Sequence, residues 1–425
     1  MAMVWLVIWQ MVSLLVDNSI LFTGPIETIM ALICNVVDPW FIKGVLGTVF
    51  RIGVGLFLGI CAGLFFAVLC KRYQRLEEFL QPFVSLLKTV PVASFVILFL
   101  IWWSSRYLAV AISFCVVFPQ IYISTLEGLK STDEKLLEMA KVFHMPAKNR
   151  LGYIYRPAVQ PFLKSSIKIS VGMAWKSGVA AEVISMGKDS IGGNLYLYKV
   201  GLDTAGVFAL TVTIIFLSYL FEKCILCMLD RFMKWEPSAE FSHSTHNRKS
   251  AKDEVIQFYN VSKSFNGQLV LADESAIYKR GQKYIFSEPS GNGKTTRFRL
   301  ICGLDNVDEG SINTFDSSIT YMFQEDRLCE HYSAVKNLEL VCGSTEKAIL
   351  YLEKILPKEC LEQPCKELSG GMKRRVALAR AFSVSSDVVL LDEPYTGLDE
   401  DNREIVKTMI AEWGKDRCIL IATHL

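Results

Sequence analysis

The stretch EPSGNGKTT at residues 288–296 decides the fold of the second half of this chain. It follows the apolar run 284–286 and leads into residues 297–301, whose sequence predicts the first turns of a helix. A strand, a glycine-rich loop and a helix in this order are the context that a phosphate-binding loop requires. In such a loop, backbone N–H groups converge on phosphate oxygens at the helix N-terminus. The stretch therefore predicts a nucleotide site in an α/β domain.

Side chains of the same stretch supply further nucleotide contacts. Lys294 can place a charge at the β- and γ-phosphates, and the Thr295 hydroxyl can ligate Mg²⁺. One position departs from the pattern, because Glu288 stands where the first glycine of such a loop normally lies. Its carboxylate brings negative charge towards a polyphosphate and a Cβ into a tight turn. The predicted nucleotide-binding residues of this loop are Ser290, Gly291, Asn292, Gly293, Lys294, Thr295 and Thr296.

Composition divides the 425 residues into two unlike halves. Hydrophobic residues make up 51% of the chain, and their excess lies almost entirely before residue 232. The net charge of +2 gives no support for a nucleic-acid partner. The 12 cysteines lack framework spacing, as expected of reduced or lipid-buried thiols. At this length we expect two or more domains, here a membrane half followed by a soluble half.

The first half predicts an all-α membrane domain of about six helices. A helix needs about 20 residues to cross the hydrocarbon, so the third expected span, 93–103, must include residues on either side of this range. No basic residue precedes the first span, so we expect the authentic N-terminus to lie further upstream. The expected spans are residues 3–22, 45–70, 93–103, 107–125, 166–186 and 205–229, with an interfacial helix at 79–87.

Charges in this half indicate its orientation and one site. Basic residues gather in the loops 71–75 and 127–165, so the positive-inside rule places those loops and both termini in the cytoplasm. Lys176 and Glu182 lie inside the fifth expected span, where ionisable groups usually face a cavity or a partner. Their spacing puts them on different helix faces. Lys176 either lines a translocation pathway for an anion or pairs with a carboxylate on another helix, and both interpretations stay open.

The long loop 127–165 is the second informative stretch. Its residues 136–143 form an amphipathic helical pattern. The loop resembles the EAA loop of bacterial ABC importer permeases, whose coupling helix docks into the ATPase, although His144 replaces the family's glycine. Neighbouring motifs resemble the permeases for aliphatic sulfonates, taurine, nitrate or thiamine precursors. The alternative is an ordinary amphipathic surface helix between two spans. The positions that match the EAA motif are Glu138, Ala140, Pro157 and Pro161.

After residue 255 the chain alternates short β-branched strands with helices, which indicates an α/β domain. Residues 368–372, LSGGM, open a basic helix and resemble the signature motif of ABC ATPases, with Arg374 where a glutamine is common. A serine hydroxyl and glycine N–H groups at a helix N-terminus make a second phosphate site. The apolar strand 388–392 followed by Glu393 resembles Walker B, in which a strand end presents two carboxylates.

The resemblance to ABC ATPases implies a role for each matching residue. Phe265 would stack on adenine, and Gln324 would link Mg²⁺ and the γ-phosphate to the coupling helix. Ser369, Gly370 and Gly371 would bind the nucleotide of a partner subunit. The metal ligands would be Thr295, Gln324 and Asp392, and the catalytic residues would be Glu393, which polarises the attacking water, His424, which contacts the γ-phosphate, and Gln324.

Together these resemblances imply a fused ABC transporter chain. Its permease domain would cover 1–234, a polar linker 235–254, and a P-loop ATPase domain with a helical subdomain 255–425. The family continues beyond this point with a helix and strands, so we expect either that the natural chain is longer or that this protein is a degraded gene product. The implied protein is a half-transporter of the cytoplasmic membrane that uses ATP and Mg²⁺ and pairs with a second copy of itself. It would import a small, anionic solute delivered by an extracytoplasmic solute-binding protein.

Two other functions stay open from the sequence. An ABC exporter is disfavoured by the short loop 127–165, because exporters of this class typically extend their helices far into the cytoplasm. A nucleotide-binding membrane protein or regulatory subunit without hydrolysis is favoured by Glu288 and by the early end of the chain. Four retained residues argue against it: Lys294, Gln324, Asp392 and Glu393.

Overall fold

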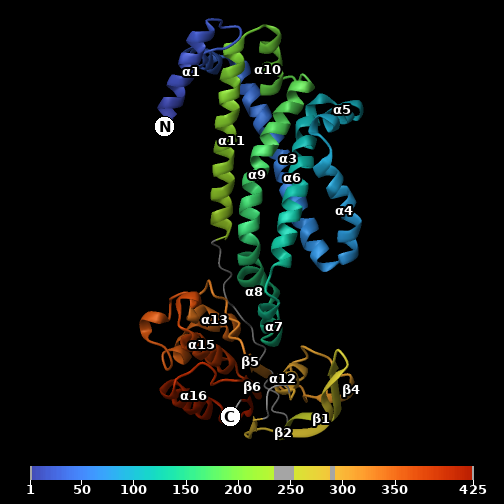
Figure 1. The fold of residues 1–425 in the computed structure, drawn as a ribbon, viewed down its shortest axis with the longest axis vertical. Helices are drawn as coiled ribbons and strands as arrows, with labels where there is room; N and C mark the ends of the chain where they lie inside the picture. Colours follow the sequence, from blue (N-terminus) through green and yellow to red (C-terminus); the bar gives the residue numbers. More distant parts are fainter. Residues whose placement is uncertain (1, 234–252, 288–291, 424–425) are drawn as a thin grey trace. The chain divides into compact units, whose positions relative to one another are not determined.

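The computed structural model describes residues 2–233, 253–287 and 292–423, and the chain divides into two compact units (Figure 1). The helical unit comprises Met1–Thr132 and Arg156–Trp235, and the α/β unit comprises Asp133–Tyr155 and Glu236–Leu425. The middle of the long loop therefore groups with the α/β unit, although both of its flanks belong to the helical unit.

Long helices α3, α6 and α9 form the centre of the helical unit (Figure 1). Glycines spaced four residues apart on α3 allow a close approach to α6: a Cβ at Gly55 would lie 2.4 Å from the Val110 carbonyl oxygen, and one at Gly63 would lie 2.8 Å from Ile121. Small residues serve this purpose at helix contacts in membranes. The helices are α1 (Ala2–Val16), α2 (Pro25–Val37), α3 (Pro39–Arg72), α4 (Gln74–Thr89), α5 (Val92–Trp102), α6 (Ser105–Lys130), α9 (Arg156–Ile184), α10 (Ile191–Val200) and α11 (Thr204–Met233).

The number of membrane spans differs from the expected six. Within the described residues, three helices (α3, α6 and α11) are long and apolar enough to cross a membrane, and the bent pair α4 and α5 makes a fourth candidate. Helix α1 ends at Val16, and α5 has 11 residues and is bent by 105° from α4. Helix α9 has 29 residues but carries several charges, which lower its hydropathy although its length suffices. Its charged side chains are Arg156, Lys164, Lys168, Lys176 and Glu182.

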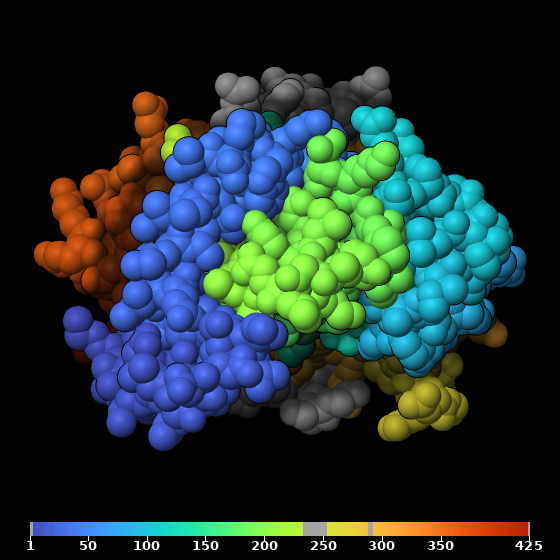
Figure 2. All heavy atoms as spheres, turned by 90° about the horizontal axis from the view of Figure 1, so that it is seen from above, coloured from blue at the N-terminus to red at the C-terminus, as the bar shows by residue number. Residues whose placement is uncertain are grey.

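The short helices cluster at one end of the helical unit. Figure 2 shows this end in space-filling form, with the α10 region in green between the N-terminal segment in blue and the α5 region in cyan. Tyr198 of α10 donates a hydrogen bond to Asn35 of α2 at 2.7 Å. Helix α10 also contacts α3, α9 and α11, so it joins the long helices at this end.

Two sheets build the α/β unit. One is antiparallel with strand order β2-β1-β4, and the other is parallel with order β3-β7-β6-β5. All five positions of β6 and of β7 are buried, as continuous apolar runs in a parallel sheet require. The strands are β1 (Glu254–Phe265), β2 (Gln268–Lys279), β3 (Lys283–Phe286), β4 (Glu309–Asn313), β5 (Ile319–Met322), β6 (Val388–Asp392) and β7 (Cys418–Ala422).

The register of the parallel sheet aligns the carboxyl ends of its four strands. Phe286 of β3 and Asp392 of β6 both pair with Ala422 of β7, and Met322 of β5 pairs with Leu391. The carboxyl ends of the four strands therefore meet at one edge, where open α/β sheets bind their ligands. Among the described residues, this edge receives residues 292–296, Gln324 and Glu393, which follow three different strands.

Helices cover this sheet and extend the core. One hydrophobic cluster joins Met139 and Phe143 of the long loop to Phe298 after the phosphate loop and to strand residues such as Leu390. A second cluster packs the helical subdomain against the opposite face of strands β5, β6 and β7. The helices of this unit are α7 (Glu134–Val142), α8 (Ala147–Arg150) with a π-helical turn (Leu151–Tyr155), α12 (Lys294–Ile301), α13 (Ala334–Cys342), α14 (Thr345–Leu352), α15 (Gly370–Ser383) and α16 (Glu400–Trp413).

Candidate nucleotide site and its coupling contact

The end of the predicted phosphate loop leads directly into α12. Gly293 is the N-cap with φ +76°, and a Cβ there would lie 2.7 Å from Leu271, so this position requires glycine. Lys294 opens the helix, is 7% exposed, and its Nζ donates to the Thr423 carbonyl oxygen at 3.3 Å. Its ammonium thus lies at the carboxyl end of β7. The predictions for Glu288, Ser290, Gly291 and His424 lie outside the described residues.

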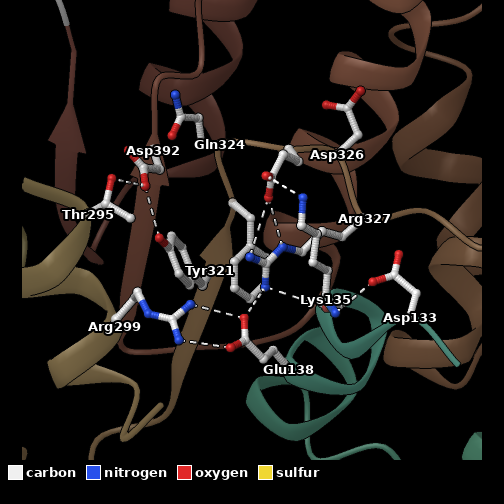
Figure 3. A network of polar contacts seen from close by, with 12 residues as sticks. Asp133, Lys135, Glu138, Thr295, Arg299, Tyr321, Gln324, Asp326, Arg327 and Asp392 are labelled. Atoms are coloured by element: carbon white, nitrogen blue, oxygen red, sulfur yellow. Dashed lines mark hydrogen bonds and ion pairs between the residues drawn. The ribbon is translucent and has the colours of Figure 1, made fainter. Parts of the chain in front are cut away.

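Asp392 and Thr295 form the metal side of the site (Figure 3). The Asp392 carboxylate is 1% exposed and accepts hydrogen bonds at 2.9 Å from both the Thr295 hydroxyl and the Tyr321 hydroxyl. Burial raises the pKa of Asp392, and these two hydrogen bonds oppose that shift. A hydroxyl and a carboxylate are oxygen ligands of the kind that Mg²⁺ takes beside nucleotide phosphates, so the pair fits this ion.

Glu393 is held in a strained conformation directly after β6. Its φ of +50° is left-handed, which is uncommon outside glycine and clusters at functional sites. Its backbone N–H donates to the Ala422 carbonyl oxygen at 2.8 Å, and the Thr396 hydroxyl donates to its carboxylate at 2.8 Å. The side chain is 9% exposed. A fixed carboxylate beside the metal side suits the predicted role in polarising water.

The other predicted nucleotide contacts occupy suitable local structures. Ser369 is the N-cap of α15, and its hydroxyl accepts from the Met372 N–H at 3.3 Å. A Cβ added at Gly370 would meet nothing within 4 Å, so the start of this helix is open to a ligand. Phe265 ends β1 with 43% of its surface exposed, as an adenine-stacking ring would need. Gln324 follows β5, and its carbonyl oxygen accepts from Arg374 at 2.8 Å.

Glu138 connects the long loop to the nucleotide site within the α/β unit (Figure 3). Its carboxylate accepts from Arg299 of α12 at 2.8 and 3.0 Å and from Arg327 at 2.6 Å. A second ion pair joins Lys135 to Glu325 at 2.8 Å. Glu325 and Arg327 closely follow Gln324 in the chain. Ala140, the other residue predicted for coupling, is 1% exposed in the core beneath this contact.

The two arginines also give the contact a pH dependence. Hydrogen bonds from Arg299 and Arg327 hold the pKa of Glu138 below its usual value. The contact therefore stabilises the folded chain fully above about pH 4.5, and this stabilisation is lost as the pH falls through the lowered pKa. We expect Glu138→Gln to lower the thermal midpoint of the detergent-solubilised chain at neutral pH, and the difference from wild type to shrink below about pH 4.5. A difference that stays constant with pH would contradict this.

In the helical unit the two predicted pathway residues have different surroundings. Glu182 is 2% exposed and pairs with Arg51 of α3 at 2.9 Å, while the Thr48 hydroxyl and the Gly192 N–H also donate to it. This cluster joins α3, α9 and α10, so its geometry is that of a structural clamp. Lys176 lies on an exposed face of α9, and it makes no ion pair with any residue in the described part of the chain. Its role in a pathway stays a prediction.

The α/β unit thus has the features of a P-loop ATPase, and comparisons with known proteins agree. Residues 271–396 match the family described as ABC transporter, and residues 59–233 match the family described as binding-protein-dependent transport system inner membrane component. An uncharacterized ABC transporter ATP-binding protein of Haemophilus influenzae is 31% identical over 40% of this chain and 75% of its own length. The chain belongs to the ABC transporter family, whose ATPase domain couples ATP hydrolysis to transport.

Two further relatives differ in the direction of transport that their names give. The sulfate/thiosulfate import ATP-binding protein CysA of Synechococcus elongatus is 34% identical over 36% of this chain and 50% of its own length. The Nod factor export ATP-binding protein I of Burkholderia lata is also 34% identical, over 40% of this chain and 62% of its own length. The chain thus spans about half to three quarters of these relatives.

Proposed function

We propose that the chain is an importer half-transporter that works as a homodimer and is driven by ATP. The contact of Glu138 with Arg299 and Arg327 carries this proposal. Arg299 lies on α12, the helix that follows the phosphate loop, and Arg327 lies three residues after Gln324. The Glu138 carboxylate on α7 therefore accepts hydrogen bonds from both segments that the proposal places at the nucleotide. Charge-assisted hydrogen bonds of this bidentate kind are the strong ones.

The residues of the site divide the chemical work. Lys294 attracts the phosphates, Thr295 and Asp392 would hold Mg²⁺, and Glu393 orients and polarises the attacking water. Mg²⁺, when bound, neutralises charge that develops on the phosphate oxygens. Ser369 and Gly371 of a second copy would close the site, so catalysis needs two chains. Movements of α12 and of the segment after Gln324 then reach the membrane helices through Glu138.

Import is favoured over export by the permease half. The ATPase half resembles both import and export ATP-binding proteins, so it does not discriminate between the two directions. The helical unit matches a family of binding-protein-dependent permeases. We therefore infer that an extracytoplasmic solute-binding protein delivers the solute.

A small anion is the solute class that the charges of α9 favour. Lys168 and Lys176 are two turns apart, which puts both on one exposed face of this helix, with Gly172 between them. Lys176 lies near the middle of the expected span 166–186, where a lysine is costly against lipid and marks a water-filled path or an ion pathway. A sulfonate, nitrate or thiamine precursor is a candidate solute, and the first two carry the complementary charge. The name of the sulfate/thiosulfate relative agrees with this class.

Transport by inside-out vesicles tests the proposal. The vesicles contain the full chain and are loaded with periplasmic extract and labelled sulfate, nitrate or taurine, and ATP is added outside. We expect ATP-dependent release of at least one of these solutes from the lumen. Accumulation in the lumen of a labelled solute that is added outside would instead identify an exporter. ATP-independent movement alone would contradict both.

Replacing Glu138 by alanine tests the coupling step separately. We expect hydrolysis to stay within about threefold of wild type while transport falls about tenfold or more, since coupling free energies correspond to factors of about 5 to 150. The matched control is Glu134→Ala on the exposed first turn of the same helix, which should change neither rate. Equal losses of hydrolysis and transport in Glu138→Ala would count against a coupling role.

A further inference from the structure

Arg374 of α15 joins two segments that carry different functional residues. One terminal nitrogen of its guanidinium donates to the carbonyl oxygens of Phe323 at 3.0 Å and Gln324 at 2.8 Å, and to the Asp326 carboxylate at 3.1 Å. The other terminal nitrogen donates to the carbonyl oxygens of Asp392 and Glu393, both at 2.6 Å. The residue is 5% exposed, so these five contacts are shielded from water.

The shape of an arginine explains why this position can hold both segments. Its planar guanidinium presents donors in a rigid fork, whereas a lysine has one ammonium group with three donors at a single point. The two bridged segments follow the neighbouring strands β5 and β6, so a fork inserted between the strand ends reaches both. Buried carbonyl oxygens that lose such partners cost free energy. The bridge therefore fixes the distance between Gln324 and Glu393.

A second buried arginine on the same helix extends this connection towards α7. Arg380 is fully buried and donates to the carbonyl oxygens of Asp326 at 2.8 Å and Arg327 at 2.7 Å. Its guanidinium also lies 5.5 Å from the ring of Phe143, just after α7. Helix α15 thus holds the whole segment 323–327, whose last residue bonds Glu138.

We propose that Arg374 is a positioning residue that makes the catalytic carboxylate of Glu393 and the segment after Gln324 move as one body with α15. Because Glu393 already has a strained backbone, the hydrogen bond to its carbonyl oxygen helps to hold the carboxylate in place. Displacement of a reacting group by about 1 Å can cost about 10²-fold in rate. The inference rests on the proposed hydrolysis but not on the solute or the direction of transport.

Arg374→Met removes every donor while keeping a long side chain. We expect kcat for ATP hydrolysis by the full chain in lipid to fall about tenfold or more, with KM for ATP within about twofold of wild type, because the phosphate loop is untouched. Lys373→Met is the control: Lys373 precedes Arg374 on α15 and pairs with the exposed Glu330 at 2.9 Å. Its kcat should equal that of wild type.

Arg374→Lys separates positioning from charge and from folding. It keeps the positive charge but reaches only one of the two segments, so kcat should fall about threefold or more, and less than in Arg374→Met. Thermal midpoints of all variants show whether each chain is folded at the assay temperature. A wild-type kcat in folded Arg374→Met or Arg374→Lys overturns the proposal, as does a loss that appears only in KM. If wild type hydrolyses ATP without transport, the proposed importer fails while this test still stands.

Discussion

Glu393→Gln is expected to reduce ATP hydrolysis by about 10² to 10⁴-fold, because an amide cannot accept a proton from the attacking water as a carboxylate can. Nucleotide binding should persist. Glutamine matches the size of glutamate, and the Thr396 hydroxyl, now 2.8 Å from the carboxylate, can donate to the amide oxygen instead. The backbone hydrogen bond to Ala422 is independent of the side chain, so the strand end should keep its shape.

Phosphate release and binding of a fluorescent ATP analogue, measured on the same preparation in lipid, check this expectation. The matched control is Glu404→Gln, an exposed residue of α16 that pairs with Lys407. It should hydrolyse ATP like wild type. If two chains close over ATP and hydrolysis reopens them, Glu393→Gln should also accumulate as a closed dimer in cross-linking with ATP. If Glu393→Gln hydrolyses ATP at the wild-type rate, Glu393 is not the catalytic base and another residue must act as the base.

The local geometry of the candidate nucleotide site could be predicted from the sequence because short motifs encode its backbone. Glycine at 293 supplies a left-handed N-cap before Lys294, and Ser369 caps α15. An apolar strand followed by two acids placed Asp392 and Glu393 at the sheet edge. Each of these features depends on residues within a few positions of one another, so the order of residues in the chain is sufficient to predict it.

The residues that connect the site to its surroundings could not be found in this way. Tyr321 bonds Asp392 across 71 residues, and Arg299 bonds Glu138 across 161 residues. The sequence distinguishes Arg374 only as a departure from a glutamine that is common in the family. Such contacts depend on which strands are neighbours, and this strand order is a tertiary property.

The membrane half shows a different reason for error. Hydropathy predicts spans from average composition, and it cannot reveal that α4 and α5 are bent by 105° from each other. Composition also leaves α9 out of the long apolar helices, although residues 166–186 predict a span there and its charges are partly neutralised inside the unit. Glu182 is one example, since its partner Arg51 lies 131 residues away on α3. An arginine inside an apolar stretch was the available signal for this pair.

Lys294→Ala is expected to abolish hydrolysis together with nucleotide binding. The ammonium is nearly buried beside the end of β7, so a phosphate placed there would meet a charge with little competing water. Loss of one preorganised donor of this kind costs about 10² to 10³-fold in rate. Unlike Glu393→Gln, this variant should also fail to bind the fluorescent analogue. If Lys294→Ala binds the fluorescent analogue with wild-type affinity, the phosphates of the nucleotide do not bind at Lys294.

Glu288→Gly should act in the opposite direction, because it removes a negative charge from the phosphate loop and supplies the glycine that such loops carry. We expect tighter ATP binding and faster hydrolysis than in wild type, measured beside Lys294→Ala as the inactive background. Wild type should lie between these two variants, with slow but real hydrolysis. If wild type matches Lys294→Ala and Glu288→Gly restores activity, Glu288 is the inhibitory residue. If Glu288→Gly stays at the Lys294→Ala level, the proposal of a working ATPase fails for this chain, since the residue that breaks the loop pattern has then been corrected without effect.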